Sequence, residues 1–202
     1  MSDASASAST FRRVAVFCGS NFGRSETYKE NAVRLADLFL ERGIGLVYGG
    51  GNVGLMGVVA DRMMEGGGEV LGVITHALQN LEVAHHGITE LTVVETMHER
   101  KRKMYDLADA IIAMPGGIGT LDELFESWTW NQLGYLNEPC GLLNVDGYFD
   151  PLVTMLDRMV TEGFLRREQR DILQVSSDPV ELLELLTQAR NPDVDKWVTG
   201  RG

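Results

Sequence analysis

The sequence predicts a single α/β domain of the Rossmann-like, doubly wound type, with a parallel sheet of about seven strands and helices on both faces. Short apolar segments alternate with amphipathic segments along the whole chain, which is typical of βαβ units with right-handed crossovers. Glycine-rich loops at residues 19–23, 49–54 and 115–119 each follow an expected strand. We therefore expect these loops to meet at the carboxyl edge of the sheet, where such folds bind ligands.

The length of 202 residues fits one domain, and a chain of this size buries roughly 70% of its unfolded surface around one core. We expect a domain over residues 13–190, a disordered leader over residues 1–12 and a flexible tail over residues 191–202. The leader lacks the basic and apolar regions of a signal peptide. Cys18 and Cys140 belong to no C-x-x-C pair, so reduced, buried thiols and a cytoplasmic location are expected.

The charge of the chain limits its partners. A net charge of −11 at pH 7 argues against a protein that follows a nucleic-acid backbone, because such proteins usually carry a basic face. No segment approaches the roughly 20 apolar residues of a membrane span, so no membrane partner is expected. An anionic ligand would need a local positive site.

The expected strands are short apolar runs bounded by glycine, proline or polar residues. They cover residues 13–18, 44–48, 70–74, 91–94, 110–114, 140–145 and 172–175. Ser25 is the expected cap of the first helix, and Gly43 its end. The second helix, at residues 55–64, is apolar on most sides, as expected of a helix buried against both the sheet and a partner. Later helices are expected from residues 97 and 120, over 149–160 and after Ser177-Asp178-Pro179.

The most informative stretch is Pro115-Gly116-Gly117-Ile118-Gly119-Thr120, which Leu121-Asp122-Glu123 follows. A strand buried on both faces leads into this stretch, and an amphipathic helix leads out of it. Its glycines allow a sharp turn and a close approach of the backbone to a ligand. The start of the helix offers N–H groups and the positive end of its dipole. These features predict a site for an anion such as phosphate.

Glu123 allows two interpretations. Thr120 and Glu123 have the T-x-x-E spacing of a capping box, in which the Glu123 carboxylate would only bind the Thr120 N–H at the helix start. Alternatively, the carboxylate lies within one helical turn of a bound phosphate and acts on the sugar attached to it. The two roles are not exclusive.

The basic segment Met97-His98-Glu99-Arg100-Lys101-Arg102-Lys103-Met104-Tyr105 begins another helix. Arg100 falls on its apolar stripe, with Lys101 beside it. Burying an unpaired guanidinium costs several kcal/mol, so Arg100 is expected to pair with a carboxylate or phosphate, or else to extend to solvent. Arg102 points elsewhere and is four residues before Asp106, with which it can pair in solvent.

The loop at residues 49–54 satisfies G-x-G-x-x-G, a dinucleotide-binding pattern. The pattern normally follows the first strand, and an acidic residue ends the next one. Here the loop follows the second strand, and the next strand runs into Thr75 and His76, so a dinucleotide site is disfavoured. Periodicity weakens over residues 76–87, and from the residues alone Glu82, His85 and His86 are expected at the surface.

With the M-H-x-R-K and P-G-G-x-G-T-x-x-E motifs both present, the sequence resembles the LONELY GUY (LOG) family of cytokinin riboside 5′-monophosphate phosphoribohydrolases, often labelled "possible lysine decarboxylase". The resemblance covers nearly the whole chain, from Val16-Phe17-Cys18-Gly19-Ser20 through Tyr48-Gly49-Gly50-Gly51 to the segment 141–148. It implies hydrolysis of the N-glycosidic bond of an N6-substituted adenosine 5′-monophosphate; action on AMP is also expected, and no metal or cofactor is.

The resemblance also implies residue roles. Arg100 and Glu123 match the catalytic pair of the family. The matching substrate-binding positions are Glu82, Lys101, Gly116, Gly117, Ile118, Gly119, Thr120, Leu121, Asp122 and Thr129, and we add Ser20, Gly50, Gly51 and Met97 from the matched segments. Asp122 departs from many members, which carry Glu there. A carboxylate near C1′ of the ribose fits the chemistry, because breaking this bond develops oxocarbenium charge on the sugar.

Three alternatives remain open at this point. The protein could be a non-catalytic nucleotide sensor on the same fold, or a general purine nucleotide nucleosidase. A lysine decarboxylase would need pyridoxal phosphate on a lysine, and of the lysines at 29, 101, 103 and 196 only Lys101 is placed near the site. The apolar helix 55–64, Trp128 and Trp130 favour a homodimer, as does the resemblance.

Overall fold

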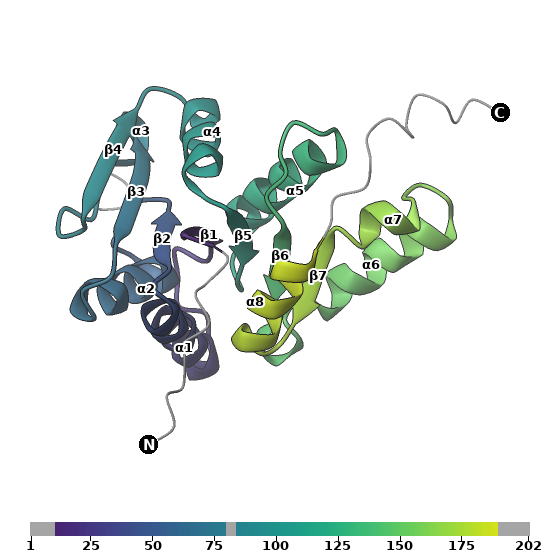
Figure 1. The fold of residues 1–202 in the computed structure, drawn as a ribbon, viewed down its shortest axis with the longest axis horizontal. Coiled ribbons are helices and arrows are strands. Elements are labelled where there is room, and N and C mark those ends of the chain that lie inside the picture. Colours follow the sequence, from purple (N-terminus) through teal and green to yellow (C-terminus); the bar gives the residue numbers. More distant parts are fainter. Residues whose placement is uncertain (1–10, 80–83, 190–202) are drawn as a thin grey trace, which may run out of the picture.

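A computed structural model describes residues 11–79 and 84–189, and its strands form one sheet. The strands are β1 (Arg13–Phe17), β2 (Gly45–Tyr48), β3 (Val70–Thr75), β4 (Glu90–Val94), β5 (Ala110–Ala113), β6 (Cys140–Leu143) and β7 (Leu173–Ser176). Within these described residues, the sheet has seven strands in the order β4-β3-β2-β1-β5-β6-β7, and every pairing is parallel (Figure 1). The predicted fold class is confirmed. The strand order reverses between β1 and β5, which places the ligand crevice of such a fold there.

Helices cover both faces of the sheet, as predicted (Figure 1). They are α1 (Glu26–Arg42), α2 (Gly54–Glu65), α3 (His76–Gln79), α4 (Met97–Leu107), α5 (Ile118–Gln132), α6 (Asp150–Thr161), α7 (Arg167–Arg170) and α8 (Pro179–Gln188), with a 3-10 turn η1 (Val145–Gly147). Alternate residues of β1 point to opposite sides. Val14 and Val16 pack with α1, α2 and α8, whereas Ala15 and Phe17 pack with α4, α5 and α6. The sheet therefore separates two apolar cores.

Local sequence signals set the ends of the first and last helices. The Ser25 hydroxyl accepts a hydrogen bond from the Thr27 N–H, and Gly43 ends α1 in the left-handed conformation, with φ 65°. At α8, the Asp178 carboxylate accepts from the N–H groups of Val180 and Glu181, and Pro179 is the first helical residue. These predicted caps are confirmed.

The start of α5 differs from the expectation. The helix begins at Ile118, with Gly117 as its N-cap, instead of at Thr120. Thr120 is therefore the third residue of the helix and Glu123 the sixth. The capping box is wrong for this helix because Thr120 already has helical neighbours on its N-terminal side.

The apolar helix α2 is explained within the chain. Its buried side chains, among them Leu55, Val59 and Met63, belong to the core beneath α1. Trp128 is buried, and its ring N–H donates to the Gln169 carbonyl, while Trp130 is half-buried against Tyr105. A partner is thus not needed to account for these residues.

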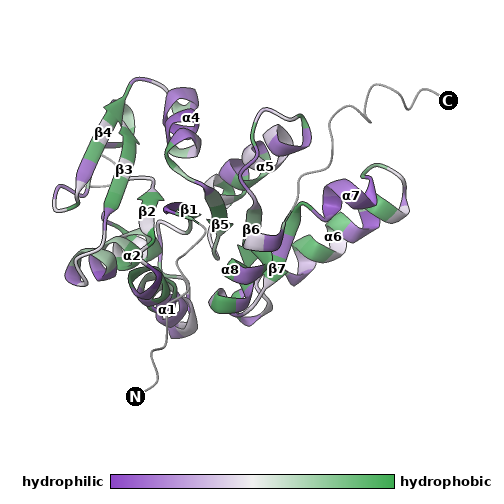
Figure 2. Cartoon of the chain, in the orientation of Figure 1, coloured by the Kyte–Doolittle hydropathy of each residue, from purple (hydrophilic) through white to green (hydrophobic). Residues whose placement is uncertain are grey.

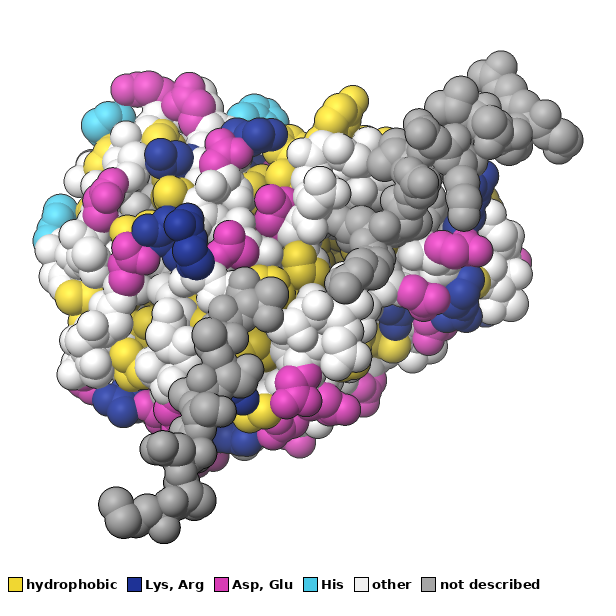
Figure 3. Space-filling model, in the orientation of Figure 1, with side chains coloured by type: hydrophobic (Ala, Val, Ile, Leu, Met, Phe, Trp, Pro, Cys, Tyr) yellow, Lys and Arg dark blue, Asp and Glu magenta, His cyan; other side chains and the backbone are white. Residues whose placement is uncertain are grey.

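The surface reflects the acidic composition. Figure 2 shows hydrophobic residues concentrated on the strands, whereas α4 is largely hydrophilic. On the face drawn in Figure 3, acidic side chains are spread over the molecule, with basic ones among them. Within the described residues, no helix has both the length and the apolar character that crossing a membrane requires.

Candidate functional site

The predicted meeting of the glycine loops occurs at the carboxyl edge of the sheet. The Gly19 N–H, after β1, donates to the Pro115 carbonyl after β5, over 3.0 Å. The Gly19 carbonyl accepts from the N–H of Leu55, at the start of α2, over 2.9 Å. Backbone hydrogen bonds therefore hold the three loops together around the β1–β5 crevice.

The glycine turn before α5 is shaped by close packing. A side chain at Gly116 would collide with the Thr120 hydroxyl group and lie 2.8 Å from the Gly19 nitrogen. At Gly117 and Gly119, by contrast, a Cβ would meet nothing within 4 Å. The turn packs its backbone tightly on one side and leaves the other side open, where a ligand can approach the first turn of α5.

No side chain caps the first turn of α5. Its N-cap, Gly117, has no side chain, and the first helical hydrogen bond runs from the Leu121 N–H to the Gly117 carbonyl over 3.3 Å. The N–H groups of residues 118–120 therefore precede the i to i−4 ladder of the helix. Together with the helix dipole, such groups favour an anion.

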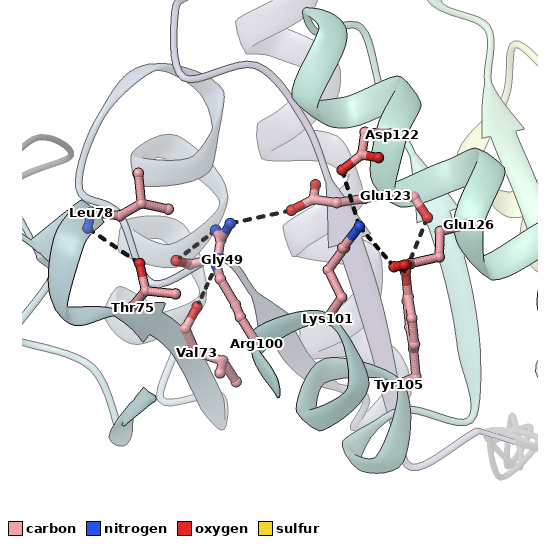
Figure 4. Close-up of polar contacts among 10 residues, drawn as sticks. All are labelled: Gly49, Val73, Thr75, Leu78, Arg100, Lys101, Tyr105, Asp122, Glu123 and Glu126. Atoms are coloured by element: carbon pink, nitrogen blue, oxygen red, sulfur yellow. Dashed lines mark hydrogen bonds and ion pairs between the residues drawn. The ribbon is translucent and has the colours of Figure 1, made fainter. Parts of the chain in front are cut away.

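Arg100 lies where its helical phase predicted, and only 5% of its side chain is exposed. The guanidinium donates to the Val73 carbonyl over 2.9 Å and to the Gly49 carbonyl over 3.0 Å (Figure 4). A Cβ at residue 49 would collide with the Arg100 guanidinium, which explains the glycine. The carboxyl ends of β2 and β3 thus fix the position of this buried cation.

Glu123 meets Arg100 from the opposite side of the crevice (Figure 4). Its Oε1 lies 3.5 Å from an Nη of Arg100, and 13% of its side chain is exposed. Of the partners considered for Arg100, a carboxylate or a phosphate, the structure shows a carboxylate, in an ion pair between α4 and α5. Burial, and then the Glu123 carboxylate, raise the pKa of the Cys18 thiol, so Cys18 stays protonated.

A cavity of about 340 Å³ contains this ion pair. Its lining comes from the β1 loop, α2, α3, α4 and the glycine turn with α5, and consists of Cys18, Ser20, Met56, Leu78, Met97, Arg100, Gly117, Ile118, Gly119, Thr120, Asp122 and Glu123. One wall is the start of α5, and another carries Arg100. The open first turn of α5 and a paired carboxylate thus face the same space.

Lys101 follows Arg100 in sequence but points to a different place. Its ammonium group lies 3.2 Å from Asp122 Oδ2 and 2.9 Å from Glu126 Oε2, between α4 and α5. Tyr105 completes this group, which we call the Lys101 cluster: its hydroxyl lies 3.1 Å from Glu126 Oε2 and 3.2 Å from the Glu123 carbonyl oxygen (Figure 4). Burial opposes the charge of Lys101, but the hydrogen bonds with Glu126 and Asp122 raise its pKa overall.

The cavity lining does not include every residue predicted for substrate binding. Lys101, Gly116, Leu121, Gly50 and Gly51 lie outside the lining, and Thr129 is exposed, further along α5. Gly50 and Gly51 belong to the β2 loop, where Gly51 forms a β-bridge with Ala84. Glu82 lies outside the described residues. The substrate contacts of these residues remain predictions.

The structure corrects the placement of His85. Its side chain is buried, whereas a surface position was expected; His86 is exposed as expected. His85 Nδ1 lies 3.2 Å from the Tyr48 hydroxyl, and Nε2 lies 3.3 Å from Asp61 Oδ1. The backbone causes this burial, because the His85 N–H donates to the Gly50 carbonyl and draws the segment against the β2 loop.

Sequence reasoning also missed several side chains at the site. Cys18, Met56 and Leu78 line the cavity, and Tyr148 donates a hydrogen bond to the Gly116 carbonyl over 2.5 Å. Cys18 stood in a matched segment, and its place directly after a strand was the available signal. Nothing local to Met56 or Leu78 distinguishes them from core residues.

The sequence is similar to known proteins over most of its length. The family described as "Possible lysine decarboxylase" matches residues 56–186. A cytokinin riboside 5′-monophosphate phosphoribohydrolase of Arabidopsis thaliana, LOG2, is 48% identical over 180 residues, which are 89% of this chain and 84% of that protein. The enzyme LOG of Oryza sativa is 50% identical over 165 residues, which are 82% of this chain and 68% of that protein.

Solved structures with the same fold are more distant in sequence. The molybdenum cofactor binding protein of Rippkaea orientalis has a TM-score of 0.65 and 23% identity, with 87% of this chain and 95% of that chain covered. The molybdenum cofactor carrier protein of Chlamydomonas reinhardtii has a TM-score of 0.64 and 16% identity, with 87% and 96% covered. At these identities the similarity shows the fold alone.

Proposed function

The chain belongs to the LOG family, and we propose that it hydrolyses the N-glycosidic bond of cytokinin riboside 5′-monophosphates, releasing the free base and ribose 5-phosphate. It is thus an N-glycosyl hydrolase, and AMP is proposed as a further substrate. One observation carries the assignment of the site: the Arg100–Glu123 ion pair shares a cavity with the open glycine turn of α5.

The 5′-phosphate is proposed to bind at the first turn of α5. The N–H groups of residues 118–120, the helix dipole and the lack of a side-chain cap at Gly117 support this position. Glu123 begins the next turn of the same helix and lines the same cavity. Binding energy from the phosphate would therefore hold the ribose near this carboxylate.

Glu123 is proposed to act at C1′ of the ribose. As the bond to the base breaks, positive charge develops on the sugar, and a carboxylate can stabilise that charge or orient the attacking water. Arg100 is proposed to hold Glu123 and to contact the substrate. Two backbone carbonyls fix Arg100, so the pair is organised before the substrate arrives.

The surroundings of Lys101 disfavour a lysine decarboxylase, which would need pyridoxal phosphate bound to a lysine. Forming a Schiff base requires a neutral amine, usually obtained by lowering the lysine pKa. At Lys101, the carboxylates of Glu126 and Asp122 raise the pKa instead, and the side chain does not line the cavity. The lysine that the sequence placed near the site is therefore stabilised in its charged form.

The test is turnover by Glu123→Gln and Arg100→Ala variants. We expect each to lower release of base from AMP and from N6-isopentenyl-AMP by roughly 10²-fold or more, because a contact specific to the transition state is lost. Arg102→Ala is the matched control, since Arg102 pairs with Asp106 at the surface. Wild-type turnover in both site variants would refute the proposal. Nucleotide binding without turnover by the wild type would instead indicate a sensor.

The substrate preference needs a separate measurement. Turnover of AMP is compared with turnover of N6-isopentenyl-AMP by the wild-type protein. Faster hydrolysis of the prenylated nucleotide supports a cytokinin-directed enzyme, whereas equal rates indicate a general purine nucleotide nucleosidase.

We also propose a homodimer and a cytoplasmic location. Leu133 and Tyr135 at the end of α5, and Phe164 after α6, expose apolar side chains that a second copy could cover. Sedimentation as a monomer at micromolar concentration would contradict the dimer. Cys18 and Cys140 are buried and free, which supports a reducing compartment; cell fractionation tests it.

A further inference from the structure

A second cavity, of about 270 Å³, lies against the other side of the glycine turn. It shares Ser20 and Gly117 with the cavity of Arg100 and Glu123, and Tyr28 and Tyr148 also line it. The two tyrosine rings meet edge to face, with centroids 5.8 Å apart. Tyr148 contacts the turn here, as Gly19 does from the loop after β1.

A turn after β6 that contains two residues in the left-handed conformation positions Tyr148. Asp146 has a φ of 53° and Gly147 a φ of 69°, and the left-handed conformation is uncommon for a residue with a side chain. Asn144 braces the turn, because its Oδ1 accepts from the Phe149 N–H over 2.7 Å. Phe149 is buried, so the residue after Tyr148 anchors the turn in the core. The backbone is thus held in a conformation that projects Tyr148 over the glycine turn.

The Tyr148 hydroxyl contacts the turn at one defined atom. It donates to the Gly116 carbonyl over 2.5 Å, while the preceding carbonyl, of Pro115, accepts from the Gly19 N–H over 3.0 Å. Two successive carbonyl groups of the turn are therefore each held by a hydrogen bond from a residue distant in sequence. In a trans peptide, the C=O of one residue and the N–H of the next point in opposite directions. Fixing the Gly116 carbonyl consequently fixes the direction of the Gly117 N–H.

We propose that Tyr148 is a positioning residue for phosphate binding. By holding the Gly116 carbonyl, it directs the backbone N–H groups at the start of α5 toward the cavity of Arg100 and Glu123. This inference rests on the proposed function, because it assigns a role in binding the 5′-phosphate. Tyr148 does not line the cavity of Arg100 and Glu123, so its role is to hold the turn. The residue is 42% exposed, so its burial contributes less to stability than that of the neighbouring core residue Phe149.

The experiment uses Tyr148→Phe, which keeps the ring and removes only the hydroxyl. We measure the affinity of ribose 5-phosphate and of free adenine by calorimetry, and kcat and KM for AMP. Losing one orienting hydrogen bond should weaken ribose 5-phosphate binding and raise KM by roughly 3- to 10-fold. Adenine affinity and kcat should change by less than about twofold.

Tyr28→Phe is the matched control. It removes a hydroxyl from the same cavity but leaves the bond between Tyr148 and Gly116 in place, so ribose 5-phosphate affinity should match the wild type. Unchanged ribose 5-phosphate affinity in Tyr148→Phe overturns the inference. Equal weakening of ribose 5-phosphate and adenine also overturns it, because that result indicates general loosening of the site.

If the proposed hydrolase activity is wrong, measurements on the wild-type protein show it separately. A wild-type protein that binds ribose 5-phosphate but releases no base from nucleotides refutes the hydrolase alone, and the Tyr148→Phe affinity still tests the positioning role. A wild-type protein that binds no ribose 5-phosphate at all overturns both proposals.

Discussion

Arg100 and Lys101 are consecutive on α4, and both side chains are buried, yet they hold different parts of the molecule. Arg100 reaches the carbonyls of β2 and β3 and forms an ion pair with Glu123 in the cavity wall. Lys101 reaches Asp122 and Glu126 on α5. The two residues diverge because successive side chains on a helix are about 100° apart. Arg100 therefore pairs with Glu123 itself, whereas Lys101 pairs with the carboxylates that precede and follow Glu123 on α5.

Burial of a charged side chain does not by itself mark a catalytic residue. The planar guanidinium of Arg100 donates in several fixed directions, which suits two carbonyls and a carboxylate at once. The ammonium of Lys101 is a compact charge held by two carboxylates one helical turn apart. Only Arg100 lines the cavity. The Lys101 cluster instead fixes how α5 sits against α4, and thereby where Glu123 points.

The largest effect should come from Arg100→Lys, which keeps the charge and removes the planar fork. A lysine cannot serve both carbonyls and Glu123 together, so kcat/KM for AMP should fall by about 10²- to 10³-fold. Steady-state kinetics measures the loss. Arg102→Lys makes the same exchange at the neighbouring exposed position and should keep activity within about twofold. Near-normal turnover by Arg100→Lys would mean that charge alone suffices.

Lys101→Met should act mainly on stability. It leaves Asp122 and Glu126 facing each other without their cation, but Asp122 is 56% exposed, so solvent reduces the penalty. We expect a loss of about 1–3 kcal/mol in the free energy of unfolding, measured with urea at pH 7. A fall in kcat/KM for AMP greater than that of Arg100→Lys would contradict the proposal that Arg100 acts in the site and Lys101 acts on stability.

The pH dependence of the unfolding free energy tests whether the charge of Lys101 is what stabilises the fold. The pKa of Lys101 is raised above 10.5 in the folded protein, so its stabilising charge is fully present below that pH and is lost as pH rises through the folded pKa. The stability difference between wild type and Lys101→Met should therefore persist from pH 7 to 9 and shrink in more alkaline solution. A difference that stays constant there would show that Lys101 stabilises through packing.

Features that depend on residues close in sequence could be predicted, whereas features that depend on contacts between distant segments could not. The caps Ser25 and Gly43 act within a few residues, and the helical phase of Arg100 indicated a core-facing guanidinium that needs an anionic partner, a carboxylate or a phosphate. The partners of Lys101 lie on another helix, so only the family resemblance suggested a role. His85 is buried because of the bridge between Gly51 and Ala84, a contact that no local pattern indicates.

The start of α5 illustrates the same limit. The T-x-x-E spacing allowed a cap at Thr120, but the turn is fixed from outside by Gly19 and Tyr148. With its carbonyls held there, the chain enters helical conformation two residues earlier than the spacing suggested. The motifs were enough to predict that Arg100, Glu123 and the glycine turn lie together, whereas the contacts that hold the turn could not be predicted.

The smallest effect should come from Asp122→Asn, compared with Glu126→Gln. Both carboxylates contact Lys101, but 56% of the Asp122 side chain is exposed against 17% for Glu126. Solvent screens the exposed pair, so Asp122→Asn should cost less than about 0.5 kcal/mol in unfolding free energy. Glu126→Gln should cost about 1–2 kcal/mol, because the charge removed is shielded from water and also meets Tyr105. If urea unfolding gave equal losses, Asp122 would stabilise the charge of Lys101 as much as Glu126 does, despite its greater exposure.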